Sequence, residues 1–472
     1  MQIDKLSKID IISLVKELTM HNLNDIKETI IKNTEEVKQL MLDAERWLWA
    51  HPQTGYTEWE ADAYLSEKFT ELGYTLTKAG NIPGFYAEID TGLPGPTLCI
   101  MGELDALDLA GHPEAVNGMS HACGHNAQGA ALLGIAAALK KPDALKGLCG
   151  KIRLMATPAE EMIQLNFREE LREKGIISYF GGKIEFMHRG FFDDVDLALM
   201  VHADTHPFLD FYCSYGNNGC MAKNITYKGL ASHAGGAPQA GINAQYAAML
   251  GLEACNALRE TFIDSEHIRF HPIMKGVSTA VNIIPDEMPI ETFIRGRSTS
   301  AIKRENKKIN RALAGAALAV GARVEIHDRP GYSPEIHDHK FMKLVEQCCT
   351  SLAGADKAVF NYEGWGTASS DFGDITQVMP GVQLNVSGAS GACHGINYQM
   401  KDAERFCLNA ARIQLLVAYA LLADNAEAAN DIISSYKPTY NSIKEYFDSI
   451  NEFFADKDAV KYDKDGNATV DF

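Results

Sequence analysis

The sequence lacks several features that would place it in a special class of proteins. Its longest apolar runs, residues 130–139 and 312–322, are shorter than the roughly 20 residues that a helix needs to cross a bilayer. Its ten cysteines form no C-x-x-C pair, and their irregular spacing does not indicate a disulfide framework. The 44 basic residues are outnumbered by 62 acidic ones. Because such a surface repels phosphate backbones, neither nucleic acid nor a membrane is expected as a partner.

Other absences limit where the protein acts and what it does. Residues 1–18 carry charge from residue 4 onward and contain no uninterrupted apolar core, so the sequence predicts no secretory signal. Unpaired thiols then fit a reducing compartment, and we expect a cytoplasmic protein. The H-x-E and P-C-x-x-C pair of zinc nucleobase deaminases is absent. A length of 472 residues, 46% of them hydrophobic, is typical of a globular protein with two or three domains.

Three short apolar runs, separated by helical stretches, are each followed by a cluster of polar residues. The runs span residues 97–101, 151–156 and 197–201, and the clusters that follow them span residues 102–105, 157–161 and 202–206. This arrangement favours buried, mostly parallel strands with helices on both faces of the sheet. In such sheets, ligand sites form beyond the carboxyl ends of the strands. The sequence therefore predicts an α/β domain with its functional site at these strand ends.

A different rhythm follows residue 216 and indicates an inserted domain. Strand-like and helical patterns alternate over residues 221–227, 241–262, 268–274, 288–294, 300–320 and 322–327. The order β-α-β-β-α-β is that of a ferredoxin-like unit, which is complete by itself. We therefore predict a lid and dimerisation domain at 217–327, inserted into a catalytic α/β domain made of residues 1–216 and 328–472. Residues 24–50 are expected to form one amphipathic helix, and residues 425–472 a helical appendage.

The first chemical signal is the run from His121 to His125, which opens a predicted helix at residues 126–139. The Cys123 thiolate and the His125 imidazole, two residues apart, can converge on one metal ion, and a helix N-terminus stabilises a thiolate. The alternative is a buried cysteine flanked by capping histidines, since C-x-H alone is a common pattern.

The second signal is a pair of adjacent carboxylates, Glu160 and Glu161, at the end of a predicted strand. Like charges this close resist joint ionisation unless a cation is nearby. Neighbouring side chains point in different directions, so one carboxylate can bind a metal while the other serves as a general base. The alternative is ordinary surface charge.

Two further histidines complete a candidate ligand set. His202 ends the next strand, and His206 is interpreted as a loop residue. His394 lies in a glycine-rich loop beside Cys393. Cys393 could also be a ligand, but adjacent residues rarely share one metal, and packing is the alternative. The full set is Cys123, His125, Glu161, His202 and His394. Five ligands are more than one tetrahedral metal site needs. They suit two metal ions that share ligands and leave one coordination position open for water. The mixture of sulfur, nitrogen and oxygen favours Zn²⁺ or Mn²⁺ over Mg²⁺.

The motifs that carry these residues resemble a known family. They are similar to the co-catalytic metallopeptidases of peptidase family M20, and most similar to its amidohydrolase branch of indole-acetyl-amino-acid, hippurate and p-aminobenzoyl-glutamate hydrolases. The shared stretches are GELDALD (102–108), HACGHN (121–126), ATPAEE (156–161), FDDVDLALMVHADTHP (192–207), GLASHAGGAPQAGINA (229–244), VNIIPD (281–286) and SSDFGDITQVMP (369–380). Together they cover about residues 45–425.

The resemblance implies roles for individual residues. It implies two divalent metal ions per subunit on the five ligands above, Glu160 as general base, and Asp105 as a residue that orients the site. For Asp105, a structural aspartate at a strand end is the alternative. His233 is implied to reach the partner's active site in a homodimer formed by the inserted domain, where it steadies the oxyanion. The residue alone indicates only an exposed loop histidine.

Two residues of the inserted domain are implied to contact substrate, namely Asn282 and Arg295. A guanidinium suits a substrate carboxylate, and Arg297, two residues further along the same predicted strand, is the alternative. The sequence departs from the family pattern at Glu103, where other branches have a histidine ligand, and at Asn126, where an aspartate is frequent. The stretch at 162–187 is longer than the corresponding loop of many relatives and is expected to reshape the substrate pocket.

The resemblance implies a metal-dependent amidohydrolase that cleaves the amide bond of N-acyl or N-aroyl amino acids or small dipeptides. A strict dipeptidase or carboxypeptidase is the alternative among enzymes. A non-catalytic binding subunit on the same fold is the alternative outside them. The Glu160 carboxylate argues against this last alternative, because a pure binder does not need a base beside its metals.

Overall fold

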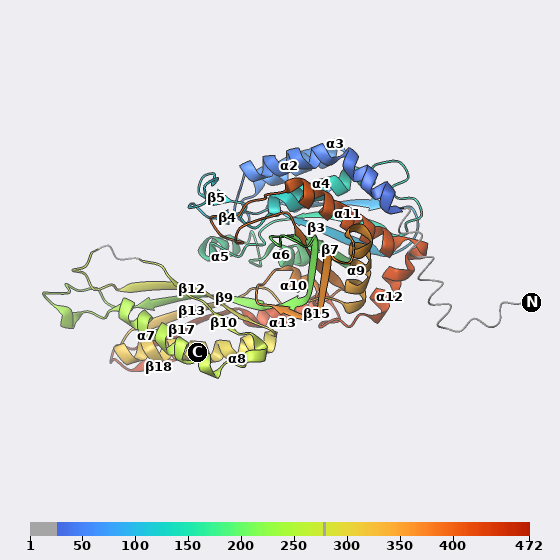
Figure 1. Cartoon of the computed structure of the whole chain (residues 1–472). Helices are drawn as coiled ribbons and strands as arrows, with labels where there is room; N and C mark the ends of the chain where they lie inside the picture. The colour runs from blue at the N-terminus through green and yellow to red at the C-terminus, as the bar shows by residue number, and fades with distance from the viewer. Residues whose placement is uncertain (1–25, 277–279) are drawn as a thin grey trace, which may run out of the picture.

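The computed structural model describes residues 26–276 and 280–472, which form two sheets with their helices. The part that carries the second sheet projects from one side of the larger part (Figure 1). Residues 1–25 lie outside the described residues. They include the N-terminal segment for which no secretory signal was predicted and the first two residues of the helix expected at 24–50. Residues 26–36 are helical and a turn at Val37 separates them from α2 (Lys38–Ala50), so the expected single helix is interrupted.

The larger sheet is parallel at its centre and antiparallel at its edges. In spatial order its strands are β1 (Leu76–Lys78), β2 (Phe85–Asp90), β6 (Lys151–Thr157), β3 (Thr97–Glu103), β7 (Leu197–Asp204), β16 (Gly381–Ser387), β8 (Phe211–Asn217) and β14 (Glu335–Ile336), with β15 (Ala358–Gly366) beside β8. Every residue of β3 is buried, as expected for a strand covered on both faces. The three predicted apolar runs are found as β3, β6 and β7.

Helices cover both faces of this sheet, which confirms the predicted fold class. One face carries α2, α3 (Trp59–Glu71), α4 (His125–Leu139), α9 (His339–Ala353) and α11 (Ala403–Leu422), and the other carries α6 (Gly182–His188) and α10 (Phe372–Ile375). Small and aliphatic side chains let α4 lie fully buried between the sheet and its neighbours. Among the described residues, only α11 is long and apolar enough to span a membrane, and 72% of its apolar window is buried inside the protein.

The smaller sheet is antiparallel, and its first elements follow in the predicted β-α-β-β-α-β order. Its strands are, in spatial order, β10 (Arg269–Phe270), β12 (Glu287–Gly296), β9 (Gly219–Lys228), β13 (Arg323–Pro330), β17 (Ala455–Tyr462) and β18 (Ala468–Val470), with β11 (Ile273–Met274) beside β12. The helices α7 (Ala244–Ala257) and α8 (Thr299–Val320) lie against one face of this sheet (Figure 1). The remaining elements are the hairpin β4 (Leu107–Asp108) and β5 (Met119–Ser120), α5 (Leu165–Glu173), α12 (Glu427–Ser435) and α13 (Ile443–Ile450).

The end of the chain differs from the expected helical appendage. After α12 and α13, the strands β17 and β18 extend the smaller sheet, so residues 455–470 do not return to the larger one. Residues 459 and 460 of β17 are buried, and β17 covers the edge of β13 that would otherwise expose unpaired backbone groups. Charged residues flank the two buried positions of β17, so the sequence pattern did not predict this strand. The domain boundaries at 216/217 and 327/328 stay a prediction.

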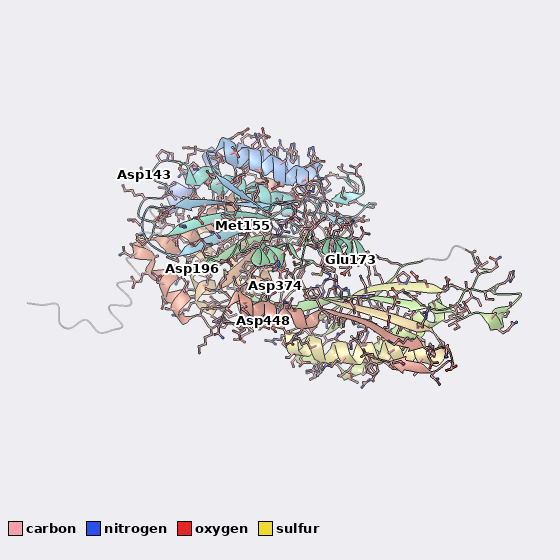
Figure 2. All side chains as sticks on the ribbon, turned by 180° about the vertical axis from the view of Figure 1, so that it is seen from behind. Asp143, Met155, Glu173, Asp196, Asp374 and Asp448 are labelled. Atoms are coloured by element: carbon pink, nitrogen blue, oxygen red, sulfur yellow. The ribbon has the colours of Figure 1, made fainter. Side chains whose placement is uncertain are left out.

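The helix α13 joins the two parts of the molecule. Its Tyr446 hydroxyl donates a hydrogen bond of 2.7 Å to Asp374 Oδ1 on α10. From behind, Figure 2 shows Asp374 and Asp448 where the two parts meet. Just after α13, Asn451 Oδ1 accepts a 2.7 Å hydrogen bond from Tyr179, which belongs to the long segment 162–187. Segment 162–187 therefore contacts the chain just after α13.

A fully buried ion network anchors segment 162–187 to the larger sheet. The Nζ atom of Lys183 lies 2.5 Å from Glu103 Oε1 and 2.5 Å from Asp371 Oδ1. The backbone N–H of Lys183 also donates to Asp371 Oδ2 at 2.8 Å. Loss of one partner would leave an uncompensated charge in the interior, so the three residues fix one another.

The contact between α2 and α4 explains why asparagine follows His125. Asn126 Nδ2 donates a 2.8 Å hydrogen bond to Glu45 Oε1, and both residues are buried. An aspartate at position 126 would place a second carboxylate against Glu45. Burial raises the pKa of Glu45 to about 7 from its ordinary value of 4.5.

This raised pKa predicts a pH-dependent stability. Between pH 4.5 and about 7 the folded protein binds more protons at Glu45 than the unfolded chain does, so stability is lost as the pH rises. The substitution Glu45→Gln keeps the acceptor for Asn126 and removes the ionisation. In urea unfolding we expect it to raise the free energy of unfolding by about 1–3 kcal/mol at pH 8 and to have little effect at pH 4.5. The exposed Glu67→Gln is the control, and equal effects at both pH values would contradict the assignment.

Candidate functional site

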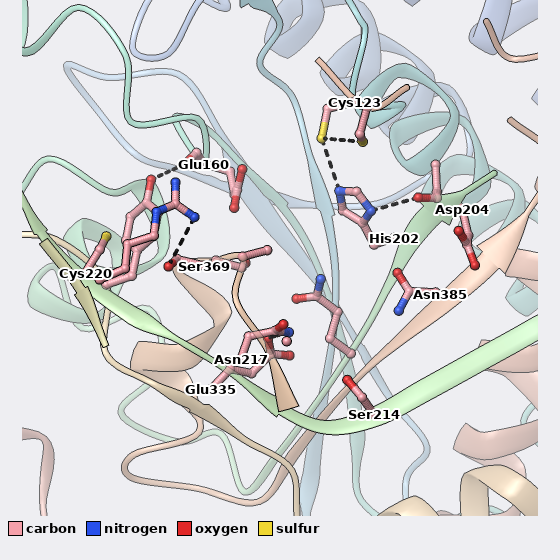
Figure 3. A pocket seen from close by; sticks show the side chains of 18 of the residues that line it. Cys123, Glu160, His202, Asp204, Ser214, Asn217, Cys220, Glu335, Ser369 and Asn385 are labelled. Carbon is pink, nitrogen blue, oxygen red and sulfur yellow. Dashed lines mark hydrogen bonds between the residues drawn. The ribbon is translucent and has the colours of Figure 1, made fainter. Parts of the chain in front are cut away.

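A cavity of about 740 Å³ lies at the carboxyl ends of β6 and β7 and opens between the two parts of the molecule. The larger part contributes Cys123, Glu160, Glu161, His202 and His394, and the smaller part contributes Cys220, Phe293 and Arg295. Figure 3 shows Cys123 and His202 on one side of the cavity, with Glu160 and Cys220 across from them. The cavity is therefore where the strand-end rule predicts a site.

Cys123, His125 and His202 bring their potential ligand atoms within 4.8 Å of one another. The Cys123 Sγ atom is 3.3 Å from His202 Nε2 (dashed line in Figure 3). His202 Nδ1 donates to the carbonyl oxygen of Ala203 at 2.9 Å, and His125 Nδ1 donates to that of Asp105 at 2.9 Å. Because both Nδ1 atoms donate to backbone carbonyl oxygens, both Nε2 atoms face the cluster, where they would bind a metal ion.

Asp105 orients two of the predicted ligands. Its Oδ1 atom is 3.1 Å from His125 Nδ1, and its Oδ2 atom accepts a 2.8 Å hydrogen bond from the backbone N–H of Glu161. A carboxylate behind a ligand histidine fixes the ring and its tautomer. These contacts favour the orienting role of Asp105 over that of a merely structural aspartate.

The turn that carries Glu160 and Glu161 is strained and held from several sides. Ala159 has a φ of +57°, a left-handed conformation that is unfavourable for residues other than glycine. The Tyr332 hydroxyl donates to the carbonyl oxygen of Glu160, and the buried Arg168 guanidinium donates to that of Glu161. Arg168 belongs to segment 162–187, so this long segment positions the carboxylate pair.

His394 approaches Glu161 from the opposite side of the cluster. Its Nε2 atom is 3.0 Å from Glu161 Oε1, and its backbone, at a φ of +61°, donates to the Ala122 carbonyl oxygen at 2.9 Å. The neighbouring Cys393 is exposed, with its Sγ atom 3.9 Å from that of Cys123. The exposure of Cys393 disfavours packing as its role. Its thiol and the potential ligand atoms of Cys123 and His394 lie within 4.8 Å of one another, so the ligand alternative is the one that the geometry favours.

The two adjacent glutamates sit in different electrostatic environments. Burial, together with the charges of Glu103 and Glu161, raises the pKa of Glu160 well above its usual range. Burial also opposes ionisation of Glu161, but His394 and His125 outweigh it and lower the pKa of Glu161 to about 2. Pairs of carboxyl groups with such divergent pKa values are typical of sites that divide binding from proton transfer.

The donor set fits divalent transition metals. Sulfur, imidazole nitrogen and carboxylate oxygen converge here, and the buried His125 Nε2 has no hydrogen-bond partner among residues 26–276 and 280–472. Glu103 Oε2 lies 3.1 Å from this nitrogen. In the sequence, Glu103 stood out only as a departure from the family pattern. The contacts of Glu103, Lys183 and Arg168 were not predicted, because no short motif marks buried partners far apart in the chain.

Arg295 of β12 lines the cavity with an almost unpaired guanidinium. Its Nε atom is buried without a hydrogen-bond partner in the described part of the chain, and its Nη1 atom makes a long contact of 3.5 Å to Ser369 Oγ (Figure 3). Arg297 is exposed, lies 4.5 Å from the ring centroid of Trp365, and does not line the cavity. Arg295 is therefore the better placed of the two for an anionic group.

His233 and Asn282 lie outside the cavity of their own chain. They are neighbours, since the Ala234 N–H donates to the Asn282 carbonyl oxygen at 2.9 Å. His233 is exposed, and its Nδ1 atom accepts a 2.8 Å hydrogen bond from the Gly236 N–H. Its proton is therefore on Nε2 and is directed away from its own backbone. The structure does not bring these two residues to the metal-ligand cluster.

Related proteins share both sequence and fold with this chain. It is 26% identical to indole-3-acetyl-aspartic acid hydrolase of Enterobacter agglomerans, over 69% of this chain and 83% of that protein. It is 26% identical to Xaa-Arg dipeptidase of Mus musculus, over 76% of this chain and 78% of that protein. It is 24% identical to thermostable carboxypeptidase 1 of Saccharolobus solfataricus, over 84% of this chain and 98% of that protein.

Solved structures show the same fold. A Bacillus subtilis protein, described as a dinuclear metal-binding peptidase of the M20 family, superposes with a TM-score of 0.61 at 19% identity, covering 82% of this chain and 99% of that one. An aminobenzoyl-glutamate utilization protein from Klebsiella pneumoniae gives 0.61 at 20% identity, covering 81% and 97%. The model of peptidase family M20/M25/M40 matches residues 99–419. The chain therefore belongs to peptidase family M20/M25/M40, as its motifs indicated, and is a hydrolase of amide bonds.

Proposed function

We propose that this protein is a two-metal amidohydrolase that cleaves the amide bond of N-acyl or N-aroyl amino acids or of small dipeptides. The observation that carries the proposal is one cavity that holds three elements together. These are a cluster of metal-type ligands, a glutamate beside it, and an arginine that has no carboxylate partner in the described part of the chain. Relatives named as an indole-3-acetyl-aspartic acid hydrolase and an Xaa-Arg dipeptidase act on such bonds.

The ligands of the proposed metal centre are Cys123, His125, Glu161, His202 and His394. Two divalent ions, Zn²⁺ or Mn²⁺ by the nature of the donors, would polarise the amide carbonyl and lower the pKa of a water molecule. Asp105 keeps the His125 ring and the Glu161 backbone in place through its two carboxylate oxygens. Arg168 and Tyr332 hold the backbone of the glutamate pair, so the base and the ligand keep their relative positions.

Glu160 is the proposed general base. It lines the cavity beside the ligand Glu161, and no lysine or arginine is paired with it in the described part of the chain. Its carboxylate would take a proton from the attacking water and return it to the nitrogen of the leaving amine. Arg295 would hold the carboxylate of the released amino acid, which suits a guanidinium with free donors. Asn282 lies beside His233 outside its own chain's cavity, and it is proposed to contact substrate in the cavity of a second subunit.

His233 is proposed to act in the cavity of a second subunit. It is exposed and lies outside its own cavity, and its Nε2–H is free to stabilise an oxyanion. Exposed apolar side chains on α7 and the flanking segments support a partner at this end of the molecule. They are Leu230, Tyr246, Met249, Leu250 and Ile283. A homodimer through the second domain would cover them.

The two alternative functions differ from the proposed one in the substrates that they would hydrolyse. A strict dipeptidase or carboxypeptidase would hydrolyse free dipeptides and leave N-acetyl amino acids intact. A binding subunit would turn over neither. Purified protein, supplied with Mn²⁺ or Zn²⁺ and assayed against N-acetyl amino acids, N-benzoyl amino acids and dipeptides, tests the proposal. Release of free amino acid from the acylated substrates is expected, and absence of any release would contradict it.

The role of Glu160 predicts a selective loss of turnover. Glu160→Gln preserves the size and position of the side chain but removes the proton acceptor. We expect kcat to fall by about 10²–10⁴-fold, while the metal content measured by mass spectrometry stays unchanged. The exposed Glu170→Gln on the neighbouring α5 is the matched control and should retain full activity. Near-normal turnover in the Glu160 variant would remove it as the base.

A role of His233 in the partner's cavity predicts complementation between two inactive variants. His233→Ala should lower kcat by about 10²–10³-fold, and Glu160→Gln is inactive for a different reason. In co-expressed heterodimers, one of the two cavities has an intact Glu160 and receives an intact His233. Statistical pairing should therefore restore about one quarter of wild-type activity. Absence of recovery, or an active monomer in analytical ultracentrifugation, would show that His233 does not act between subunits.

A further inference from the structure

One wall of the cavity consists of polar side chains from β8 and β16. These are Tyr212 and Ser214 of β8 and Gln383 and Asn385 of β16, and all four line the cavity. Asn385 pairs with Tyr212 on one side and with His202 of β7 on the other. The wall therefore begins one strand away from a proposed metal ligand. Figure 3 shows Asn385 and Ser214 facing the cavity on the side of His202.

These four side chains make no hydrogen bond to any residue within 26–276 and 280–472. The Oε1 atom of Gln383 is buried as well as unpartnered. Polar groups inside a protein are normally paired, and those that line a cavity and are not paired take their partners from water or from a ligand. The wall thus offers several free donors and acceptors beside the reacting centre.

Three further residues of the cavity lining are, by contrast, paired with one another. Asn217 Nδ2 donates a 2.7 Å hydrogen bond to Glu335 Oε2, and His337 Nε2 lies 2.5 Å from Glu335 Oε1. His337 Nδ1 donates to the carbonyl oxygen of Ser214 at 2.8 Å. This pairing balances the carboxylate with an imidazolium and fixes the backbone of β8. Beside this paired carboxylate in the same lining, the side chains of Tyr212, Ser214, Gln383 and Asn385 present neutral hydrogen-bonding groups.

The other side of the cavity has a different character. There Arg295, Phe293 and Cys220 come from the second domain, with Ser369 beside the guanidinium (Figure 3). In a substrate whose carboxylate binds Arg295 and whose amide lies beside Glu160, the acyl group would lie against the wall formed by β8 and β16. A purely hydrocarbon or aryl group there would displace water from the four polar side chains of the wall without replacing its hydrogen bonds.

We infer that the wall formed by Tyr212, Ser214, Gln383 and Asn385 binds the acyl group of the substrate, and that this group carries hydrogen-bonding substituents such as hydroxyl, amine or amide. The inference rests on the proposed function and narrows its substrate class. Sites built to hydrogen-bond a substrate group discriminate strongly against an analogue of the same size that lacks it. The preferred substrates are therefore peptide-like or hydroxyacyl amides rather than alkanoyl or aroyl ones.

A pair of substrates of equal size tests this directly. N-glycolyl and N-propionyl derivatives of one amino acid differ only in a hydroxyl in place of a methyl group. The amino acid is the one released fastest from its N-acetyl derivative. We expect kcat/KM to be at least about tenfold higher for the glycolyl compound. In Asn385→Leu this ratio should fall to about 1 or below, and in Ser214→Ala, a smaller change that keeps the strand intact, it should fall severalfold.

The ratio separates failure of this inference from failure of the proposed function. Asn430→Leu, an exposed position on α12 outside the cavity, is the control and should leave the ratio unchanged. Equal hydrolysis of both substrates, a preference for propionyl, or an unchanged ratio in both wall variants would overturn the inference while the amidohydrolase activity stands. Absence of hydrolysis of all acylated amino acids would overturn both.

Discussion

The crowding of buried carboxylates at the ends of β3 and β6 is the constraint on which the rest of the structure depends. Glu103, Asp105, Glu160 and Glu161 are all buried within one small region. A buried anion is expensive unless a cation or several hydrogen bonds accompany it. Lys183 compensates Glu103 on the side away from the cavity. On the side of the cavity the compensation comes from histidines and, in the proposed enzyme, from metal ions.

The segments around this cluster hold its parts in place. Segment 162–187 supplies Arg168 to the glutamate turn and Tyr179 to α13, while β17 ties the end of the chain to the second sheet. The left-handed backbone at Ala159 persists because its surroundings over-determine it. Arg329 links the two segments, because it pairs with Glu169 of segment 162–187 and with Asp456 of β17.

The sequence predicted the larger sheet and the location of the site because both depend on local patterns. Apolar runs marked β3, β6 and β7, short motifs at the ends of β6 and β7 contained Glu161 and His202, and the motif before α4 contained Cys123. The ion network of Lys183 could not be predicted, since its partners lie 80 and 188 residues away in the chain and no motif links them. The strand β17 was missed because charged residues flank its short buried part. The exposure of Cys393 could not be predicted, because a lone cysteine carries no sign of it.

In the proposed enzyme, five side chains converge to hold two divalent ions on which hydrolysis depends. The most direct measurement is the metal content of active protein by mass spectrometry, combined with stepwise return of Mn²⁺ or Zn²⁺ to metal-free protein. We expect about two ions per chain, with activity lost on chelation and regained as both ions bind. Full activity in protein that holds no transition metal would contradict the two-metal centre.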